Sequence, residues 1–231
     1  MDQDEDKLHP EKSNRPIASG EISTKVALVY AILLAGLSFT IAYTLNFNVV
    51  VILLVYLCIN LLYSTVLKNF VIVDLVIIGI GFLLRIYAGG LATEIPISDW
   101  LSIMVFLISL FMALAKRRDD ALLYQKTKLD VRKNIKFYNL QFIDSTLSML
   151  AGVVIVAYIM YSMSPALKER VGSEYIFMTS LFVIIGVMKY LHRIFSENEK
   201  GSPVNVLFSD RLIQLSLIGW LLTFYVLIYI S

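Results

Sequence analysis

Residues 71–92 read VIVDLVIIGIGFLLRIYAGGLA, and Asp74 and Arg85 are the charged side chains in this run. A helix needs about 20 apolar residues to cross the hydrocarbon core of a bilayer, so the run predicts a membrane-spanning helix. Six further blocks approach this length, namely Val26–Tyr43, Val49–Leu67, Trp100–Ala115, Ser145–Met163, Tyr175–Tyr190 and Leu212–Ile230. Together the seven blocks predict an all-α integral membrane protein, organised as a single domain over residues 1–231.

The Lys and Arg residues are distributed unevenly between the two sides of this predicted bundle. If the blocks cross alternately from an inner N-terminus, 17 of the 20 fall on the inner side. Lys168 and Arg170 fall on the outer side, and Arg85 lies within a span. Because inner connections of membrane proteins carry the excess of Lys and Arg, the N-terminus is expected in the cytoplasm and Ser231 outside.

Several classes of protein are disfavoured by composition. The single cysteine, Cys58, excludes a disulfide framework, and two histidines argue against a His-based metal site. We find no nucleophile elbow, phosphate-binding glycine loop or dinucleotide-binding glycine pattern. No basic-aromatic surface indicates a nucleic-acid partner, so none is expected.

The polar N-terminal stretch contains two acids at helical spacing. Asp6 follows Asp2 by four positions, and on a helix this spacing places both carboxylates on one face, about 6 Å apart. Such a pair can hold Mg²⁺, whose remaining ligands are water and substrate phosphate. Lys12 and Arg15 follow closely and can neutralise that phosphate. The alternative interpretation is a solvated acidic tail.

Two further polar stretches, 116–141 and 191–211, are also predicted on the inner side. The first opens with Lys116-Arg117-Arg118-Asp119-Asp120, a mixed cluster at the end of a span that suits a metal-bound diphosphate. Alternatively its cations are ordinary juxtamembrane charge, and the remainder to residue 141 reads as a charged loop. In the second stretch, Ser209 or Asp210 is expected to cap the last helix rather than to catalyse.

Charged residues inside spans are functional candidates, because their burial in hydrocarbon is costly. Asp74 and Arg85 are 11 residues apart and share one helix face at two depths. Arg85 has a structural alternative, in which it bonds to neighbouring helices. Lys68, near Tyr63 at an inner helix end, either reaches a phosphate or extends to the interface. Gly89-Gly90 is expected to loosen the end of its helix.

Taken in order, these stretches resemble a known family. The matching text is Asp2-x-x-x-Asp6 leading to His9-Pro10-x-Lys12-x-x-Arg15-Pro16-Ile17-Ala18-x-Gly20, then Leu84-Arg85, Ala88-Gly89-Gly90-x-Ala92-Thr93-x-Ile95-Pro96-x-Ser98-x-Trp100, Ser109-Leu110-Phe111-Met112, Lys116-Arg117 and Asp210-Arg211. The set covers nearly the whole chain and resembles the UbiA superfamily of intramembrane prenyltransferases, most of all its decaprenyl-phosphate phosphoribosyltransferase branch.

The resemblance implies a nine-span helical bundle around a cavity open to the cytoplasm, in a bacterial inner membrane. Seven spans are present here, so we expect two spans and the start of the first Asp-rich motif to precede Met1 in the complete protein. It also implies Mg²⁺-dependent transfer of a 5-phosphoribosyl group from phosphoribosyl diphosphate to a polyprenyl phosphate. The implied catalytic and metal-binding residues are Asp2, Asp6 and Asp120, where the family has glutamate in place of Asp120. The implied substrate-binding residues are Lys12, Arg15, Tyr63, Lys68, Arg85, Lys116, Arg117 and Arg118.

Two other functions are compatible with parts of the pattern. A UbiA-type prenyltransferase would move a prenyl group from prenyl diphosphate to an aromatic acceptor. Its second motif is a spaced Asp pair, whereas here three cations precede adjacent acids, which favours the phosphoribosyl hypothesis. A transporter or scaffold would account for Asp74 and Arg85 but not for Asp2 and Asp6. The oligomeric state is not predicted.

Overall fold

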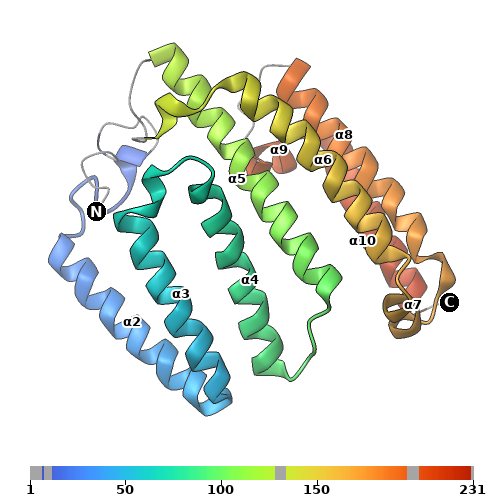
Figure 1. Ribbon diagram of the computed structural model, residues 1–231, viewed down its shortest axis with the longest axis horizontal. Helices are drawn as coiled ribbons and strands as arrows, with labels where there is room; N and C mark the ends of the chain where they lie inside the picture. The colour runs from blue at the N-terminus through green and yellow to red at the C-terminus, as the bar shows by residue number, and fades with distance from the viewer. Residues whose placement is uncertain (1–6, 8–11, 128–133, 197–202, 230–231) are drawn as a thin grey trace. The chain divides into compact units, whose positions relative to one another are not determined.

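The computed structural model describes residues 7, 12–127, 134–196 and 203–229, and every regular element within them is helical (Figure 1). Seven helical segments are long and apolar enough to cross a membrane, which confirms the seven predicted spans. They are α2 (Thr24–Leu45), α3 (Phe47–Thr65), α4 (Val73–Thr93), α5 (Asp99–Thr127), α6 (Leu140–Ser162), the segment Glu174–Ser196 and α10 (Arg211–Tyr229).

Short helices precede the first span, lie in connections between spans or, in the case of η4, begin a span. They are η1 (Lys12–Asn14), η2 (Leu67–Asn69), η3 (Ile135–Phe137), α7 (Pro165–Val171), η4 (Glu174–Thr179) and α9 (Pro203–Ser209). The sixth span consists of η4 followed directly by α8 (Ser180–Ser196).

The chain divides into two compact units. Unit 1 comprises Met1–Ser98 and Asp120–Asn139, and unit 2 comprises Asp99–Asp119 and Leu140–Ser231. In unit 1, α2, α3 and α4 lie side by side in chain order (Figure 1). In unit 2, α8 packs against both α6 and α10. Helix α5 begins in unit 2, and its last residues belong to unit 1.

One residue makes the corner between α2 and α3. The backbone N–H of Asn46 donates to the carbonyl of Ala42 and so closes α2. Its side-chain oxygen accepts from the N–H of Asn48 at 2.8 Å and so begins α3. Since asparagine adopts the extended conformation of an N-cap readily, a single polar residue suffices to reverse the chain between two apolar helices.

Helix α4 is bounded by unusual backbone rather than loosened by glycine. It continues through Gly89 and Gly90 to Thr93, so the predicted loosening is wrong. A Cβ at Gly90 would lie 2.6 Å from Cγ1 of Ile97 and 2.9 Å from the carbonyl oxygen of Ile95. Gly90 therefore lets the next connection fold back onto the helix. At the other end, Ile72 adopts a φ of 71°, which is costly for a β-branched residue.

Helix α5 extends well beyond the apolar block that predicted it. It has 29 residues and a length of about 43 Å, against about 30 Å for the hydrocarbon core. The predicted charged loop after residue 116 is therefore helical as far as Thr127, which corrects the sequence interpretation. Residues 116–127 contain Ala, Leu, Lys, Arg and Gln but no Gly or Pro, so helix propensity continues where hydropathy stops.

The interior of unit 2 is closely packed around a small apolar cluster. Met104 of α5 meets Ala157 and Tyr158 of α6 there. On α10, Gly219 leaves no room for a methyl group beside the ring of Phe182, so this glycine permits close approach of α8 and α10. Outward-facing apolar side chains are widely exposed, as expected for helices that face lipid.

Candidate functional site

The basic and acidic cluster of residues 116–120 lies within α5, about 26–32 Å along the helix from Asp99. That distance matches the thickness of the hydrocarbon core, so the cluster falls at a membrane boundary. Arg117 and Asp120 are buried, whereas Lys116 is exposed. A buried cation and a buried carboxylate three residues apart, at the boundary between lipid and water, form a polar site rather than a solvated face.

Arg118 is held by two other helices of unit 2. Its Nε donates to Oδ1 of Asp144 on α6 at 2.7 Å, and its guanidinium stacks over the ring of Phe195 on α8 at 5.4 Å. The Nη1 atom is buried and has no hydrogen-bond partner among the described residues. Arg118 thus braces the end of the helix bundle and leaves one charged donor available to an anion.

The start of α10 forms a second charged corner in unit 2. Oδ1 of Asp210 accepts from the N–H groups of Leu212 at 2.9 Å and Ile213 at 3.2 Å, which confirms the predicted cap. Oδ2 faces Arg193 at 3.2 Å and Lys189 at 3.5 Å. Burial acts to raise the pKa of the Asp210 carboxyl. The two N–H groups and the charge of Lys189 lower that pKa by a larger amount, so it lies below its ordinary value. Asp210 therefore fixes the helix start and neutralises two cations of α8.

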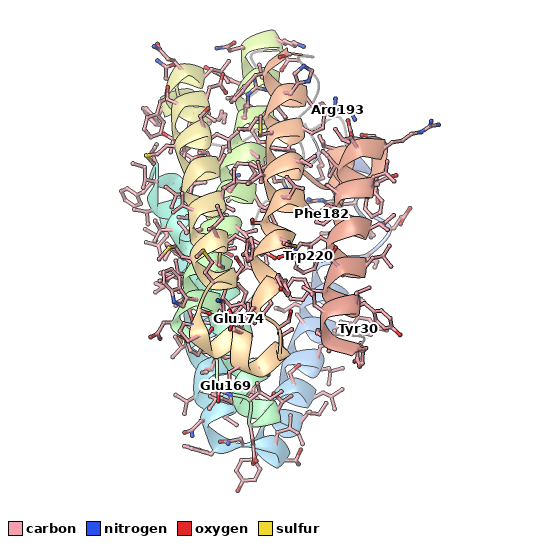
Figure 2. All side chains as sticks on the ribbon, turned by 90° about the vertical axis from the view of Figure 1, so that its right-hand side faces the viewer. Tyr30, Glu169, Glu174, Phe182, Arg193 and Trp220 are labelled. Carbon is pink, nitrogen blue, oxygen red and sulfur yellow. The ribbon has the colours of Figure 1, made fainter. Side chains whose placement is uncertain are left out.

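Unit 2 also contains an apolar cavity of about 560 Å³ among α5, α6, α8, α9 and α10. Figure 2 shows two of its lining residues, Phe182 and Trp220, between α8 and α10. Nε1 of Trp220 donates to the hydroxyl of Tyr158 at 2.6 Å, and that hydroxyl lies 2.8 Å from Oγ1 of Thr179. Because this chain of hydrogen bonds pairs the polar atoms with one another, the cavity surface is left for an apolar ligand.

In unit 1, the fully buried carboxylate of Asp74 joins two connections between helices. Oδ1 accepts from the Tyr138 hydroxyl at 2.7 Å, and Oδ2 accepts from Nδ2 of Asn134 at 3.2 Å. Nδ2 of Asn134 also donates to the backbone carbonyl of Lys68 at 2.9 Å. The Tyr138 hydroxyl accepts the N–H of Ile72 at 3.2 Å, which holds the strained residue in place. The network ties residues 134–138 to the turn before α4, so we interpret Asp74 as structural.

Arg85 faces a second polar group in unit 1. Its Nη2 donates to the hydroxyl of Tyr56 at 2.5 Å, and its guanidinium lies 5.3 Å from the ring centroids of Tyr56 and Phe82. A cavity of about 130 Å³ adjoins these residues and is also lined by Asn60 and Tyr63. The predicted residues Arg85 and Tyr63 are therefore brought to one cavity, whereas Asp74 lies in the separate network with Tyr138.

Three predicted site residues lie outside what the structure describes. Asp2 and Asp6 fall in undescribed positions, as does the side chain of Lys12, and Arg15 is described as exposed. Within the described ranges no three acidic, His or Cys side chains gather as a metal site. Asp120 and its neighbour Asp119 offer carboxylate oxygens, the ligand type that Mg²⁺ prefers. The donor chemistry of the predicted set therefore fits Mg²⁺, with Asp120 as its described member.

Sequence reasoning missed the partners of several charged residues. Asp144, Asn134, Tyr138 and Tyr56 stand in no motif, and the first three lie in or beside stretches that we interpreted as loop or plain span. A detectable signal was present for Asp144, since an acid at the start of an otherwise apolar block requires a partner. For Asn134 and Tyr138 we find no signal in the sequence.

The chain matches the UbiA prenyltransferase family over residues 1–217. This chain belongs to the UbiA prenyltransferase family. A relative from Mycolicibacterium smegmatis, named decaprenyl-phosphate phosphoribosyltransferase, is 30% identical over 237 residues, which cover 100% of this chain and 74% of the relative. The Mycobacterium tuberculosis protein of that name is 27% identical over 222 residues, which cover 96% of this chain and 72% of the relative.

A solved structure supports the UbiA fold independently. The UbiA homolog from Archaeoglobus fulgidus, described as bound to DMAPP and Mg²⁺, superposes with a TM-score of 0.68 at 19% identity. The match covers 100% of this chain and 80% of that chain. At this identity the likeness establishes the fold alone. Together with the family match, it identifies the protein as a multi-pass membrane enzyme, a transferase of the UbiA family.

Proposed function

We propose that this UbiA-family protein transfers a 5-phosphoribosyl group from phosphoribosyl diphosphate to a polyprenyl phosphate of the decaprenyl type, in an Mg²⁺-dependent reaction. The observation that carries the proposal is the buried cluster on α5, where Arg117 and Arg118 directly precede Asp119 and Asp120. Similarity to decaprenyl-phosphate phosphoribosyltransferases along the whole chain supports the same substrate pair.

Different residues are proposed to bind the metal ion and the phosphates of the donor. Asp2, Asp6 and Asp120 are the proposed ligands of Mg²⁺, which when bound would neutralise the donor diphosphate. Lys116 and Arg117 on α5, with Lys12, Arg15 and Lys68, are proposed to contact its phosphate oxygens. Arg118 braces α5 through Asp144, and its buried Nη1, which has no described partner, is proposed to donate to the same anion.

In the proposed reaction, the bond between C1 of ribose and the diphosphate oxygen breaks, and the electron pair leaves with diphosphate. A phosphate oxygen of the lipid forms the new bond to C1, whose positive character is greatest midway through the exchange. Cations that hold the diphosphate stabilise the charge that develops on it as it leaves. Since the attacking phosphate is already an anion at neutral pH, no general base is required, which agrees with the scarcity of histidine.

The apolar cavity of unit 2 suits the other end of the acceptor. Its volume of about 560 Å³ and its apolar lining, which runs along α10 from Ile213 to Phe224, are appropriate for part of a polyprenyl chain. In unit 1, Lys68 lies in η2 shortly before α4 begins, and in unit 2, Lys189 and Arg193 face Asp210 just before α10 begins. We propose that these helix ends face the cytoplasm, where the water-soluble donor is available.

The test uses membranes that contain the protein expressed from its complete gene. They are incubated with labelled phosphoribosyl diphosphate, a polyprenyl phosphate and Mg²⁺, and label is measured in the lipid phase. We expect labelled lipid that is lost on chelation and in Asp120→Asn, and retained in Glu169→Gln, which alters an exposed acid on α7. Transfer of a prenyl group from prenyl diphosphate to an aromatic acceptor, without labelled lipid, would show the alternative UbiA activity instead.

A further inference from the structure

Helix α3 lies beside α4 in unit 1 (Figure 1). It presents a line of polar side chains to a cavity that it shares with α4. Tyr56, Asn60 and Tyr63 are spaced by four and three residues, so they lie on one face of the helix. All three line the cavity of about 130 Å³ that Arg85 adjoins. The line extends about 10 Å along the axis, from Tyr63 near the end of α3 to Tyr56 deeper in the span.

The polar atoms that face this cavity are only partly paired. A guanidinium has five N–H donors, and within the described part of the chain Tyr56 is the hydrogen-bond partner of Arg85. Asn60 uses its amide N–H on the carbonyl of Tyr56, at 2.7 Å, which leaves its side-chain oxygen facing no described donor. The hydroxyl of Tyr63 likewise bonds to no described residue. Donors and an acceptor are therefore available to a ligand.

The charge of Arg85 is not balanced nearby. Arg85 lies 12 residues into α4, about 18 Å from its start, and so is deep in the span. Among the described residues no carboxylate lies within salt-bridge distance of it. The rings of Tyr56 and Phe82 provide partial compensation, each at 5.3 Å. A full positive charge at this depth is costly, and such residues commonly bind an anion or line a substrate path.

We propose that Arg85, Tyr56, Asn60 and Tyr63 form a binding site for a phosphate monoester carried by a substrate. The planar guanidinium matches phosphate oxygens, and the hydroxyl and amide groups can bond to the atoms around them. The proposal rests on the proposed function in one respect, that both substrates carry such a group. The 5-phosphate of the ribosyl donor and the phosphate of the lipid acceptor share this chemistry.

The first measurement is ligand-dependent thermal stability of the purified protein, which needs no turnover. The probes are ribose 5-phosphate, for the donor, and farnesyl phosphate, for the lipid. We expect one probe to stabilise wild type and to lose its effect in Arg85→Met, with affinity weaker by about 10- to 100-fold, as for loss of a charged hydrogen bond. The probe that loses its effect identifies the source of the phosphate. Arg170→Met removes an exposed arginine on α7 and should respond to both probes as wild type does.

A second pair of readouts separates this role from a merely structural one. Without ligand, Arg85→Met should be as stable as wild type or more stable, because an unbalanced charge is replaced by an apolar chain of similar length. Its KM should rise for the substrate whose phosphate is bound. Tyr56→Phe keeps the charge of Arg85 and the aromatic ring but removes the hydroxyl that orients the guanidinium. It should weaken binding of the same ligand by about 3- to 10-fold.

Two results would overturn the site: neither probe depends on Arg85, or Arg85→Met loses stability while both KM values stay unchanged. Dependence of farnesyl phosphate binding on Arg85, in a protein that transfers no phosphoribosyl group, would support the site and reject the proposed function. Probe binding that does not depend on Arg85, in a protein that does transfer the phosphoribosyl group, would reject the site and support the proposed function.

Discussion

Asp74 in unit 1 and two acids in unit 2, Asp144 and Asp210, are held by different kinds of group. In unit 1, Asp74 accepts hydrogen bonds from Tyr138 and Asn134, which carry no charge. In unit 2, Asp144 is paired with Arg118, and Asp210 with Lys189 and Arg193. The polar groups within the spans show the reverse pattern of charge. Unit 1 has the charged Arg85 there, whereas unit 2 has the neutral set of Trp220, Tyr158 and Thr179.

This difference separates residues that maintain the fold from residues suited to chemistry. A buried acid whose oxygens are occupied, such as Asp74, stabilises the turn to which it is bonded. A cation with donors still available, such as Arg85 or Arg118, retains the capacity to bind an anion. The position of a charged residue inside the membrane therefore does not by itself reveal its role. The role follows from whether its hydrogen-bonding atoms are already occupied.

The largest effect is expected where charge serves the reaction. Asp120→Asn should reduce kcat by about 100-fold or more, in the range seen when one electrostatic contact to a developing charge is removed. Stability should change little, because size and polarity are retained. Steady-state kinetics with the labelled donor measures kcat, and thermal unfolding measures stability. A normal kcat would remove Asp120 from the proposed metal site.

Asp74→Ala should instead damage the fold of unit 1. It leaves the Tyr138 hydroxyl and the Asn134 amide without their buried acceptor, which costs about 2–5 kcal/mol. Tyr138→Phe removes only the hydroxyl and should cost about 1–2 kcal/mol. Equilibrium unfolding in mixed detergent micelles gives these values, and hydrogen exchange should show the loss at residues 67–76 and 134–138.

The matched control for these variants is Tyr30→Phe, which alters an exposed tyrosine on α2 and should change stability by less than about 0.5 kcal/mol. Unchanged exchange at residues 67–76 in Tyr138→Phe would contradict the role that we assign to the network.

A third prediction compares glycines in the two units. Gly219→Ala in unit 2 should destabilise by about 1–3 kcal/mol, because the added methyl group would overlap the ring of Phe182. Gly81→Ala in unit 1 should be tolerated, since its Cβ would lie at an ordinary 3.7 Å from Cε2 of Tyr56. Thermal unfolding of both variants checks this. Equal losses would mean that packing is equally tight in the two units.

The smallest effect concerns pH. The folded state lowers the pKa of Asp210, so its carboxylate adds stability above the pKa of the unfolded chain, and this is lost as the pH falls through the lower folded value. Asp210→Asn retains the cap but not the charge, and should cost about 1 kcal/mol at neutral pH. The difference from wild type should shrink as the pH falls below about 4. A difference independent of pH would show that the ion pairs with Lys189 and Arg193 contribute nothing.

Most of the fold was accessible from the sequence, and the candidate site only in part. All seven spans were predicted, because the length and hydropathy of each block are local properties. The cap formed by Asp210 was also predicted, since an N-cap bonds to its own next turn. The helical extension of α5 was not, because hydropathy reports what enters lipid rather than what remains helical beyond it.

By itself, then, the amino-acid sequence determined that the chain crosses a membrane seven times as helices, and it carried the motifs that place it in the UbiA family. The tertiary structure decided which partner each polar residue meets. Arg118 and Asp144 are 26 positions apart, Tyr56 and Arg85 are 29, and Asp74 and Tyr138 are 64. Insertion into a bilayer depends on each segment alone, whereas a hydrogen bond between distant residues exists only once the helices that carry them have packed.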